Sequence, residues 1–574
     1  MSTICSNCQN TFLISESDQA FYQKIAPFFA GQSYPIPPPT LCPTCRQQRR
    51  LATRNDDTLY NRNCSKCHKS IISIYPEVKE YPVYCSACWW SDQWDAGDHY
   101  EEYNFSKSFF PQFESLRAKV PRLGLINRNA ENSEYTHYTS HNKNCYLIFN
   151  ADDNQDCYYS HSLDACRDCI DMYWSGRSEL CYEGISVGAS YNSQFCTHVE
   201  NMSDCYFCYD CKDCHHCFGC FSLDHKEYHI YNQPYSKEEY EEGIQTIRKQ
   251  KKSHTGLMAL KKEVAQFFLT LPHQYATITN CENCTGNYLV SCNNCINCFN
   301  LTRAQDCKYI YDGSNIKDAY DGNFCGLQNS QLMYEVQDCW FGYQMFFSTT
   351  CWNCNNMYYC DHCFYSNNCF GCIGLRRKEY CILNKQYTKE EYEKLVPQII
   401  KQMSGGSKNE DTEELRRRQT QRPRQEEALE GRQEWEWGEF FPMSLALFAY
   451  HETMAQQYFP QPGNAAQVAI STTDSLPDTI DAIGDGILQS TLHCSQCQKG
   501  YRIVPQELAF YRQRELPIPR KCFMCRQSDR VTLCLERKLY ERHCHKCNRE
   551  LLSPYQVDRP ETIFCNQCYL DYHH

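Results

Sequence analysis

The sequence predicts a mostly β protein, in which tandem zinc-ribbon modules at both termini flank a duplicated, short-coil β-solenoid that is rich in Cys and Tyr and carries capping helices. Three observations support this prediction: C-x-x-C pairs near both chain ends, a 12-residue recurrence of cysteine in the middle, and a longer repeat at an offset of 152 residues. Cysteine makes up 44 of 574 residues. Aliphatic residues are sparse, so metal or stacked Cys and aromatic side chains must hold the fold together.

The two terminal modules match each other and predict four zinc sites. Each carries four C-x-x-C pairs, and the gaps after the second and third pairs have equal lengths in the two modules: 46–63 matches 526–543, and 68–84 matches 548–564. Two such pairs supply the four thiolates that tetrahedral Zn²⁺ requires. The expected ligands in residues 1–100 and 491–574 are Cys5, Cys8, Cys42, Cys45, Cys64, Cys67, Cys85, Cys88, Cys494, Cys497, Cys522, Cys525, Cys544, Cys547, Cys565 and Cys568.

The pairing of these cysteines is open at the level of sequence. The simplest assignment joins consecutive pairs, and the alternative is an interleaved, cross-brace pairing. A closed four-thiolate site has no free position for catalysis, so the zinc is expected to be structural. His68 and His545 stand beside ligand cysteines and are expected to be neighbours rather than ligands.

Basic residues cluster in the same modules. Residues 42–69 hold seven Lys and Arg against two Asp and Glu, and residues 512–549 hold eleven against four. Such clusters could contact phosphate. They could equally offset the charge of about −2 on a four-thiolate zinc site. The candidate nucleic-acid contacts are Arg46, Arg49, Arg50, Arg526 and Arg530.

The middle of the chain contains two nested repeats. Cys145, Cys157, Cys169 and Cys181 recur every 12 residues, after which the step becomes 15 and then 9. A short period with a small residue at each step is typical of a narrow solenoid with one coil per repeat. At an offset of 152 residues, the segment 369–394 repeats the segment 217–242.

Both copies end in a helix start with a capping box, Ser236 with Glu239 and Thr388 with Glu391. A helix at this point would cover the open edge of the last coil. The expected segments are a helical connector at 101–130, the first solenoid copy with its closing helix at 131–245, a second helical connector at 246–280 and the second copy with its closing helix at 281–402.

Four cysteines persist in both copies as two C-x-x-C pairs nine residues apart. If a coil had nine residues there, the pairs would lie on neighbouring coils and four thiolates could hold one zinc. Reduced cysteine columns in a dry core would explain the same spacing. The zinc count is therefore expected to be four, or up to six if these residues bind: Cys208, Cys211, Cys217, Cys220, Cys360, Cys363, Cys369 and Cys372.

Residues 403–490 are expected to form a linker that contains an aromatic segment. The stretch 403–434 is charged and poor in aliphatic residues, which predicts a flexible chain. The stretch 435–460 is rich in aromatic residues. It could dock on the solenoid or on a partner, or it could pack as a tail of the central region.

Other protein classes are not indicated. The first residues lack a basic region followed by an apolar stretch, and no run of about 20 apolar residues occurs. We therefore expect a cytoplasmic protein without a membrane span. No phosphate-binding loop, dinucleotide fingerprint, zinc-protease motif or nucleophile elbow occurs either. We expect no enzyme activity and identify no small-molecule substrate.

The C-terminal module resembles the probable zinc-ribbon family of bacterial treble-clef-like fingers, on the residues Cys494, Cys497, Phe510, Tyr511, Leu516, Pro517, Cys522, Cys525, Arg526 and Arg530. The whole chain resembles large zinc-ribbon proteins of small-genome, candidate-phyla bacteria, on the segments 42–50, 109–123, 380–392 and 437–460. This resemblance implies zinc and a cytosolic bacterial origin, and it implies no particular activity. The chain departs from the pattern at Phe448, Ala449 and His451.

The leading functional hypothesis is a non-catalytic zinc-binding scaffold whose terminal ribbons bind RNA or a ribonucleoprotein, with two tethered ends that gain avidity. The net charge of −12 argues against a protein that coats nucleic acid along its whole length. The first alternative is a protein–protein adaptor with purely structural zinc. The second is a zinc buffer or thiol redox sink, which the thiol count suggests.

Overall fold

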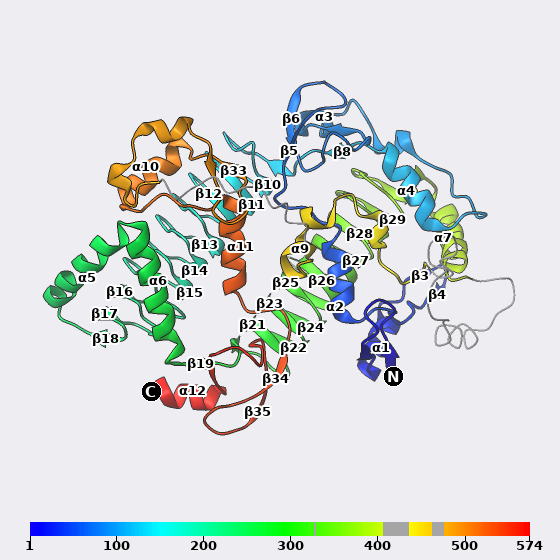
Figure 1. The fold of residues 1–574 in the computed structure, drawn as a ribbon. Helices are drawn as coiled ribbons and strands as arrows, with labels where there is room; N and C mark the ends of the chain where they lie inside the picture. The colour runs from blue at the N-terminus through cyan, green and yellow to red at the C-terminus, as the bar shows by residue number, and fades with distance from the viewer. Residues whose placement is uncertain (327–328, 406–435, 462–475, 574) are drawn as a thin grey trace. The chain divides into compact units, whose positions relative to one another are not determined.

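The structure, a computed structural model, divides the chain into two compact units (Figure 1). It describes residues 1–326, 329–405, 436–461 and 476–573. The first unit comprises Met1–Asn55, Tyr60–Gly124 and Ala276–Gln461, and the second comprises Asp56–Leu59, Leu125–Tyr275 and Pro462–His574. Each unit therefore combines one terminal module with the repeat region that lies farther from it in the sequence.

The repeat region of the second unit, residues 125–235, is a ladder of parallel strands that we call the first ladder. Strands pair in a 12-residue register, in which His137 lies opposite Phe149 and His161 opposite Tyr173. Its strands are β9 (Asn127–Arg128), β10 (His137–Ser140), β11 (Tyr146–Asp152), β12 (Tyr158–Asp164), β13 (Tyr173–Gly176), β14 (Ile185–Gly188), β15 (Thr197–Glu200), β16 (His215–Phe218), β17 (Glu227–Ile230) and the antiparallel β18 (Gln233–Pro234).

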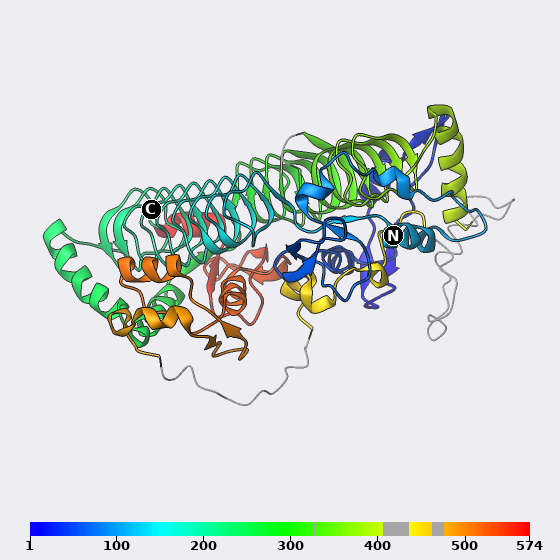
Figure 2. The same ribbon diagram turned by 90° about the horizontal axis from the view of Figure 1, so that it is seen from above.

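The repeat region of the first unit, residues 276–386, forms the second ladder. It has the same 12-residue register, as between Cys339 and Cys351, with two exceptions: Ile278 pairs with Leu289, one position short of that period, and Ile316 pairs with Ser330, two positions beyond it. The repeated turns of both ladders are visible in Figure 2. The strands are β20 (Ile278–Thr279), β21 (Gly286–Val290), β22 (Asn293–Ile296), β23 (Cys298–Thr302), β24 (Gln305–Lys308), β25 (Tyr311–Ser314), β26 (Ile316–Cys325), β27 (Ser330–Phe346), β28 (Thr349–Tyr358), β29 (Asn367–Phe370), β30 (Glu379–Ile382) and β31 (Lys385–Gln386).

Within the ladders the backbone repeats every three residues. Asn144, Leu147 and Asn150 all have φ near +50°, and the residues that follow them, such as Cys145 and Ile148, point into the interior. Four such tripeptides make one 12-residue turn. Asn and Asp hold many of the left-handed positions, because they tolerate this conformation better than other residues with a side chain.

Hydrogen bonding explains why so many interior residues are cysteine or serine. In the tripeptide 143–145, the N–H of Lys143 donates to Asn154 O at 2.9 Å and that of Asn144 donates to Glu131 O at 2.9 Å, one turn on either side. The N–H of the interior Cys145 instead donates to Ser133 Oγ at 2.9 Å. Where an interior side chain is serine, cysteine or asparagine, it can thus accept a hydrogen bond from the N–H of the next turn, as Ser160 Oγ does from Met172 N at 2.9 Å.

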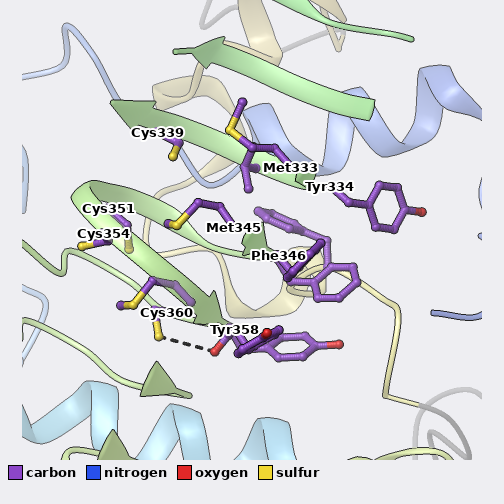
Figure 3. Packing of buried hydrophobic residues seen from close by; sticks show 14 of the residues in the cluster. Met333, Tyr334, Cys339, Met345, Phe346, Cys351, Cys354, Tyr358 and Cys360 are labelled. Carbon is purple, nitrogen blue, oxygen red and sulfur yellow. Dashed lines mark hydrogen bonds between the residues drawn. The ribbon is translucent and has the colours of Figure 1, made fainter. Parts of the chain in front are cut away.

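Cysteine can accept this bond while filling little space. Lys226 N donates to Cys214 Sγ at 3.4 Å, and the Cys214 thiol itself donates to Lys212 O at 3.1 Å. The second ladder packs in the same way, and Figure 3 shows its stacked Met, Phe and Cys side chains with the bond from Cys360 Sγ to Tyr358 O. Burial of apolar area in these columns replaces an ordinary aliphatic core.

The condition under which the central C-x-x-C pairs would lie on neighbouring coils, a nine-residue coil, is not met. The 12-residue register continues where the cysteine spacing changes, because Gln194 pairs with Tyr206 and Tyr206 with Phe218. Interior residues that are 12 positions apart lie above one another and form a column, and neighbouring columns are three residues apart in sequence. A step of 9 or 15 residues therefore places the next cysteine in an adjacent column. The spacing between cysteines therefore does not measure the length of a turn.

The outer surface carries its own side-chain columns at the left-handed positions. Asn132 Nδ2 donates to Asn144 Oδ1 at 3.1 Å, and Asn144 Nδ2 donates to Asp156 Oδ1 at 3.1 Å. The second ladder repeats the pattern with a 2.7 Å bond from Asn294 to Asp306. Each contact joins equivalent positions on neighbouring turns, so it reinforces the backbone register from outside.

A helix follows the last strand of each ladder. The capping boxes at Ser236 and Thr388 are present. None of the helices in the described ranges is long and apolar enough to cross a membrane. The helices outside the zinc modules are α4 (Phe109–Lys119), α5 (Lys237–Lys251), α6 (His254–Leu269), α7 (Lys389–Met403) and α9 (Met454–Tyr458).

The part of the aromatic segment that the structure describes, residues 436–461, packs within the first unit. Trp437, Phe440 and Phe441 are buried in its core, and the carboxylate of Glu436 accepts bonds from the N–H groups of Phe109 and Phe110 at the start of α4. The segment is therefore a packed tail of this unit. Of the linker expected at 403–490, residues 406–435 and 462–475 lie outside the described residues. Its last part is not flexible chain, because two 3-10 helices, Ile480–Ala482 and Asp485–Gln489, lie there and Ile480 and Ile483 are buried in the core of the second unit.

Interior cysteines should tolerate serine but not a larger side chain. Cys181 lies in a column of small residues, formed by Ser133, Cys145, Cys157, Cys169, Cys181, Ser193, Cys205 and Cys217. Replacing Cys181 by Ser preserves its hydrogen bonds to Glu179 O and Ser190 O, so stability should change little. Cys181→Leu should cost about 1–3 kcal/mol through overpacking. Urea unfolding of both variants tests this, and equal midpoints would contradict it.

Candidate metal centres

Sixteen cysteines assemble into four clusters, one for each pair of consecutive C-x-x-C motifs. Within each cluster all four Sγ atoms lie within 4.8 Å of one another. The consecutive pairing is thereby confirmed, and the cross-brace alternative is wrong. The clusters are Cys5, Cys8, Cys42 and Cys45; Cys64, Cys67, Cys85 and Cys88; Cys494, Cys497, Cys522 and Cys525; and Cys544, Cys547, Cys565 and Cys568.

The first C-x-x-C of each cluster lies in a tight turn between two short strands. Cys5 N donates to Asn10 O at 2.9 Å, Gln9 N donates to Cys5 O at 3.1 Å, and Gln9 has φ +61°. The same bonds and the same positive φ recur in the other three turns. The strands are β1 (Ser2–Ile4) with β2 (Thr11–Leu13), β5 (Tyr60–Asn63) with β6 (Ser70–Ser73), β32 (Leu492–His493) with β33 (Gly500–Tyr501), and β34 (Tyr540–His543) with β35 (Glu550–Ser553).

The second C-x-x-C of each cluster lies at the start of a helix. Cys42 is the N-cap of its helix, and Cys45 lies in the first turn. This placement brings thiolates to the positive end of the helix dipole. The helices are α2 (Pro43–Leu51), α3 (Ser86–Trp89), α11 (Phe523–Leu533) and α12 (Asn566–His573).

Backbone N–H groups favour the thiolate form at these sites. Cys42 N donates to Cys5 Sγ at 3.2 Å, and Cys565 N donates to Cys544 Sγ at 3.3 Å. Burial opposes ionisation, but the N–H donors outweigh it and lower the pKa of Cys5 to about 7 and that of Cys544 to about 6. One thiol of each of these two sites is therefore favoured as the thiolate, whereas burial raises the pKa of Cys42, Cys45 and Cys568.

The geometry fits zinc. Zn–S bonds of about 2.3 Å place the sulfurs of a regular tetrahedron about 3.8 Å apart. The Sγ–Sγ distance is 3.7 Å between Cys8 and Cys42 and 3.8 Å between Cys67 and Cys85. The two C-terminal clusters give 3.7 Å each. With four thiolates each, these are closed sites, where zinc supplies structural cross-links and leaves no position for a substrate.

Comparison with known families agrees with this geometry. Residues 1–54, which contain the first cluster, match the family described as a probable treble clef domain. No curated protein matches the chain. The chain is thus a zinc-binding protein with a treble-clef-like domain at residues 1–54 and three further four-cysteine clusters that fit zinc.

The histidines and central cysteines do not join these sites. His68 and His545 are exposed and belong to none of the four clusters. Among the described residues, the central cysteines form no group of ligand atoms that could hold a metal. In the C-x-x-C pairs of the first ladder the thiols donate to carbonyl oxygens, as Cys211 Sγ does to Tyr209 O at 3.3 Å. The described residues therefore provide the four four-cysteine sites that the terminal modules predict, and the two further sites at the central cysteines are not formed.

The arginines expected to contact nucleic acid in the first unit are buried. Arg46, Arg49 and Arg50 lie on α2 and face the second ladder. Arg46 Nη2 lies 2.8 Å from Asp321 Oδ2, and Arg49 Nη2 lies 2.8 Å from Glu335 Oε1. Both carboxylates are fully buried. Burial raises the pKa of Glu335, and Arg49 and Arg50 act against that rise.

The second unit repeats this arrangement on α11. Arg530 Nη1 lies 2.8 Å from Asp171 Oδ1, and Arg526 Nε lies 3.3 Å from the same oxygen. Arg526 also pairs with Glu507 at 3.4 Å and stacks over the ring of Tyr159. Carboxylates within the same unit thus neutralise all five arginines. The assignment of these residues as nucleic-acid contacts is corrected: their guanidinium groups hold the modules on the ladders.

The acidic partners were not recognised from the sequence, although a signal for them exists. Asp171 and Asp321 are 150 residues apart. Equivalent residues of the two ladders have this offset up to β26, and the offset becomes 152 in β27 because the step from β26 to β27 has two extra residues. Arg46 and Arg526 follow equivalent cysteines in their modules. A search for acidic residues shared by both copies would have found this pairing.

The purified protein should contain four zinc ions per chain. Sixteen thiolates in four clusters can hold four ions, and the central thiols are engaged by backbone carbonyls. Elemental analysis with protein quantified by amino-acid analysis measures the ratio. A value near six would restore the central cysteines as ligands.

Removing a buried arginine should destabilise the protein much more than removing an exposed lysine. Arg46→Met leaves Asp321 buried without its closest partner and should cost about 3–5 kcal/mol. Lys24→Met is a suitable control, because Lys24 pairs with Asp318 of the same ladder at 2.6 Å while 53% of its side chain is exposed. The control should cost about 0–1 kcal/mol. Urea unfolding of the zinc-loaded chain measures both, and similar losses would contradict the role given to Arg46.

Proposed function

We propose that the protein is a non-catalytic scaffold in which zinc modules fix two β-solenoids and present basic zinc knuckles to RNA or a ribonucleoprotein. The proposal rests on one arrangement that occurs in both units: buried arginines hold a zinc module on a ladder of 12-residue turns. The 12-residue register with four interior positions per turn is the pattern expected of a β-solenoid with one coil per repeat.

The basic residues that remain exposed support an RNA contact. We call a C-x-x-C turn between two strands a knuckle. The knuckle of the second zinc site in the N-terminal module carries Lys66 and Lys69, and the corresponding knuckle of the C-terminal module carries Lys546 and Arg549 at equivalent positions. Lys69, Lys546 and Arg549 are exposed. Zinc knuckles with basic residues are a known mode of single-stranded RNA recognition. These four residues replace the buried arginines as the proposed phosphate contacts.

A second candidate is a protein–protein adaptor for a basic partner. Residues 125–235 carry 16 Asp and Glu against 6 Lys and Arg, a net charge of −10. This field would repel RNA from the first ladder and attract a positively charged protein surface. A thiol redox sink is less favoured, because most central cysteines are buried.

We also propose a reducing, cytoplasmic location and no enzymatic activity. All 44 cysteines, which lie within the described residues, are free of disulfide bonds. A chain with this many thiols needs a reducing compartment to stay in this state. The closed zinc sites supply no open coordination position for catalysis.

Charge reversal at the knuckles should weaken RNA binding. The full-length, zinc-loaded variant Lys69→Glu with Arg549→Glu removes one basic residue from each knuckle. The control, Lys79→Glu with Lys538→Glu, makes the same change in charge at exposed positions outside the knuckles. Fluorescence anisotropy with a mixed-sequence single-stranded RNA should show at least about tenfold weaker binding for the knuckle variant only. The slope of log K against log salt should fall by about 2.

Two outcomes would contradict the RNA contact. Equal losses in both variants would show that only the total charge matters. No measurable RNA binding by the unmodified protein would leave the adaptor as the better proposal, and affinity capture with basic protein surfaces would then be the next measurement.

A further inference from the structure

We propose that the first zinc site of each module is a latch: bound zinc holds two helices on the ladder, and loss of the metal uncovers the ladder face beneath them. This inference concerns a metal-dependent change within each unit, and it does not depend on the identity of the partner.

The zinc site encloses one of the two helices in a loop. α1 (Glu16–Lys24) lies between Cys8 and Cys42, whose Sγ atoms are 3.7 Å apart. α1 also contacts the second ladder: Phe21 stacks on Tyr320 with ring centroids 3.7 Å apart. Lys24 pairs with Asp318 at 2.6 Å, and Asp18 pairs with Lys308 at 2.7 Å. Zinc therefore joins both ends of a docked segment and limits its freedom to leave.

The second helix starts at the metal and carries the buried charges. Cys42 is the N-cap of α2, and Cys45 directly precedes Arg46. Arg46, Asp321 and Glu335 are each at most 2% exposed. A buried charge that loses its partner is strongly destabilising, so a partly undocked α2 is unfavourable. The helix should dock or leave as a whole.

The second unit contains the same construction. α10 (Pro505–Arg514) lies between Cys497 and Cys522, and Glu507 on this helix accepts a hydrogen bond from Tyr159 of the first ladder at 2.9 Å. Arg526 and Arg530 follow on α11, which begins after Cys522. The arrangement of a loop helix, a zinc cluster and an arginine helix is thus present twice.

The second zinc site of the N-terminal module contacts other turns of the second ladder and provides the control. Trp89 of α3 packs against Phe364, and Arg376 Nη1 donates to Trp89 O at 2.8 Å. The latch helices instead contact Asp318, Asp321 and Glu335 in β26 and β27, and Lys308 in β24. Disruption of one site should therefore expose a different part of the ladder from disruption of the other.

Hydrogen exchange of the full-length chain, read peptide by peptide, tests the latch. Zinc removal with a chelator should accelerate exchange in β26 and β27 by about tenfold or more, and added Zn²⁺ should restore protection. Cys42→Ser should reproduce the acceleration in β26 and β27. Cys85→Ser should leave those strands protected and expose peptides around Phe364 and Arg376 instead.

A third variant keeps the test decisive if loss of a ligand unfolds the module. Arg46→Met with Arg50→Met retains all sixteen ligand cysteines, so the chain should still hold four zinc ions while β26 and β27 exchange rapidly. The latch is wrong if Cys42→Ser leaves β26 and β27 protected, or if Cys85→Ser exposes them equally. It is also wrong if Cys42→Ser raises exchange equally in β11 and β12 of the other unit, whose own zinc ligands are intact in this variant, because general unfolding would then explain the result.

Discussion

The ladders depend on one backbone constraint: every third residue is left-handed, and the N–H of the next residue points inward without a backbone acceptor. At many positions that N–H donates to a side-chain oxygen or sulfur one turn earlier, as Cys145 N does to Ser133 Oγ and Lys226 N does to Cys214 Sγ. This bonding favours small side chains that can accept a hydrogen bond inside a dry core, which is why cysteine and serine share a column. The cysteine content of the ladders is thus a consequence of backbone geometry, whereas the sixteen cysteines of the terminal modules are the metal ligands.

Metal and charge have separate roles in each unit. Zinc fixes the local shape of a module that has too few apolar residues to fold around a core of its own. Buried arginine–carboxylate pairs then specify where that module lies on its ladder. Since an unpaired charge is costly in this interface, the pairs favour one arrangement over others that would bury a similar apolar area.

The sequence predicts the zinc ligands and the presence of a 12-residue repeat well, because both leave regular spacings of one residue type. It predicts the turn length poorly beyond Cys181, since cysteines that change column also change their spacing. The role of Arg46 and Arg530 could not be derived from local charge, because their acidic partners Asp321 and Asp171 are far away in the chain and become neighbours only on folding. A long-range ion pair leaves no local pattern.

The pairing of each module with the more distant ladder has a consequence for synthesis on the ribosome. Arg49 and its partner Glu335 are 286 residues apart. At about 5–20 residues per second, the N-terminal module waits roughly 15 to 60 s after its own synthesis before its ladder emerges. During that time its arginines are exposed to solvent, and a nascent chain in this state is the form most accessible to chaperones.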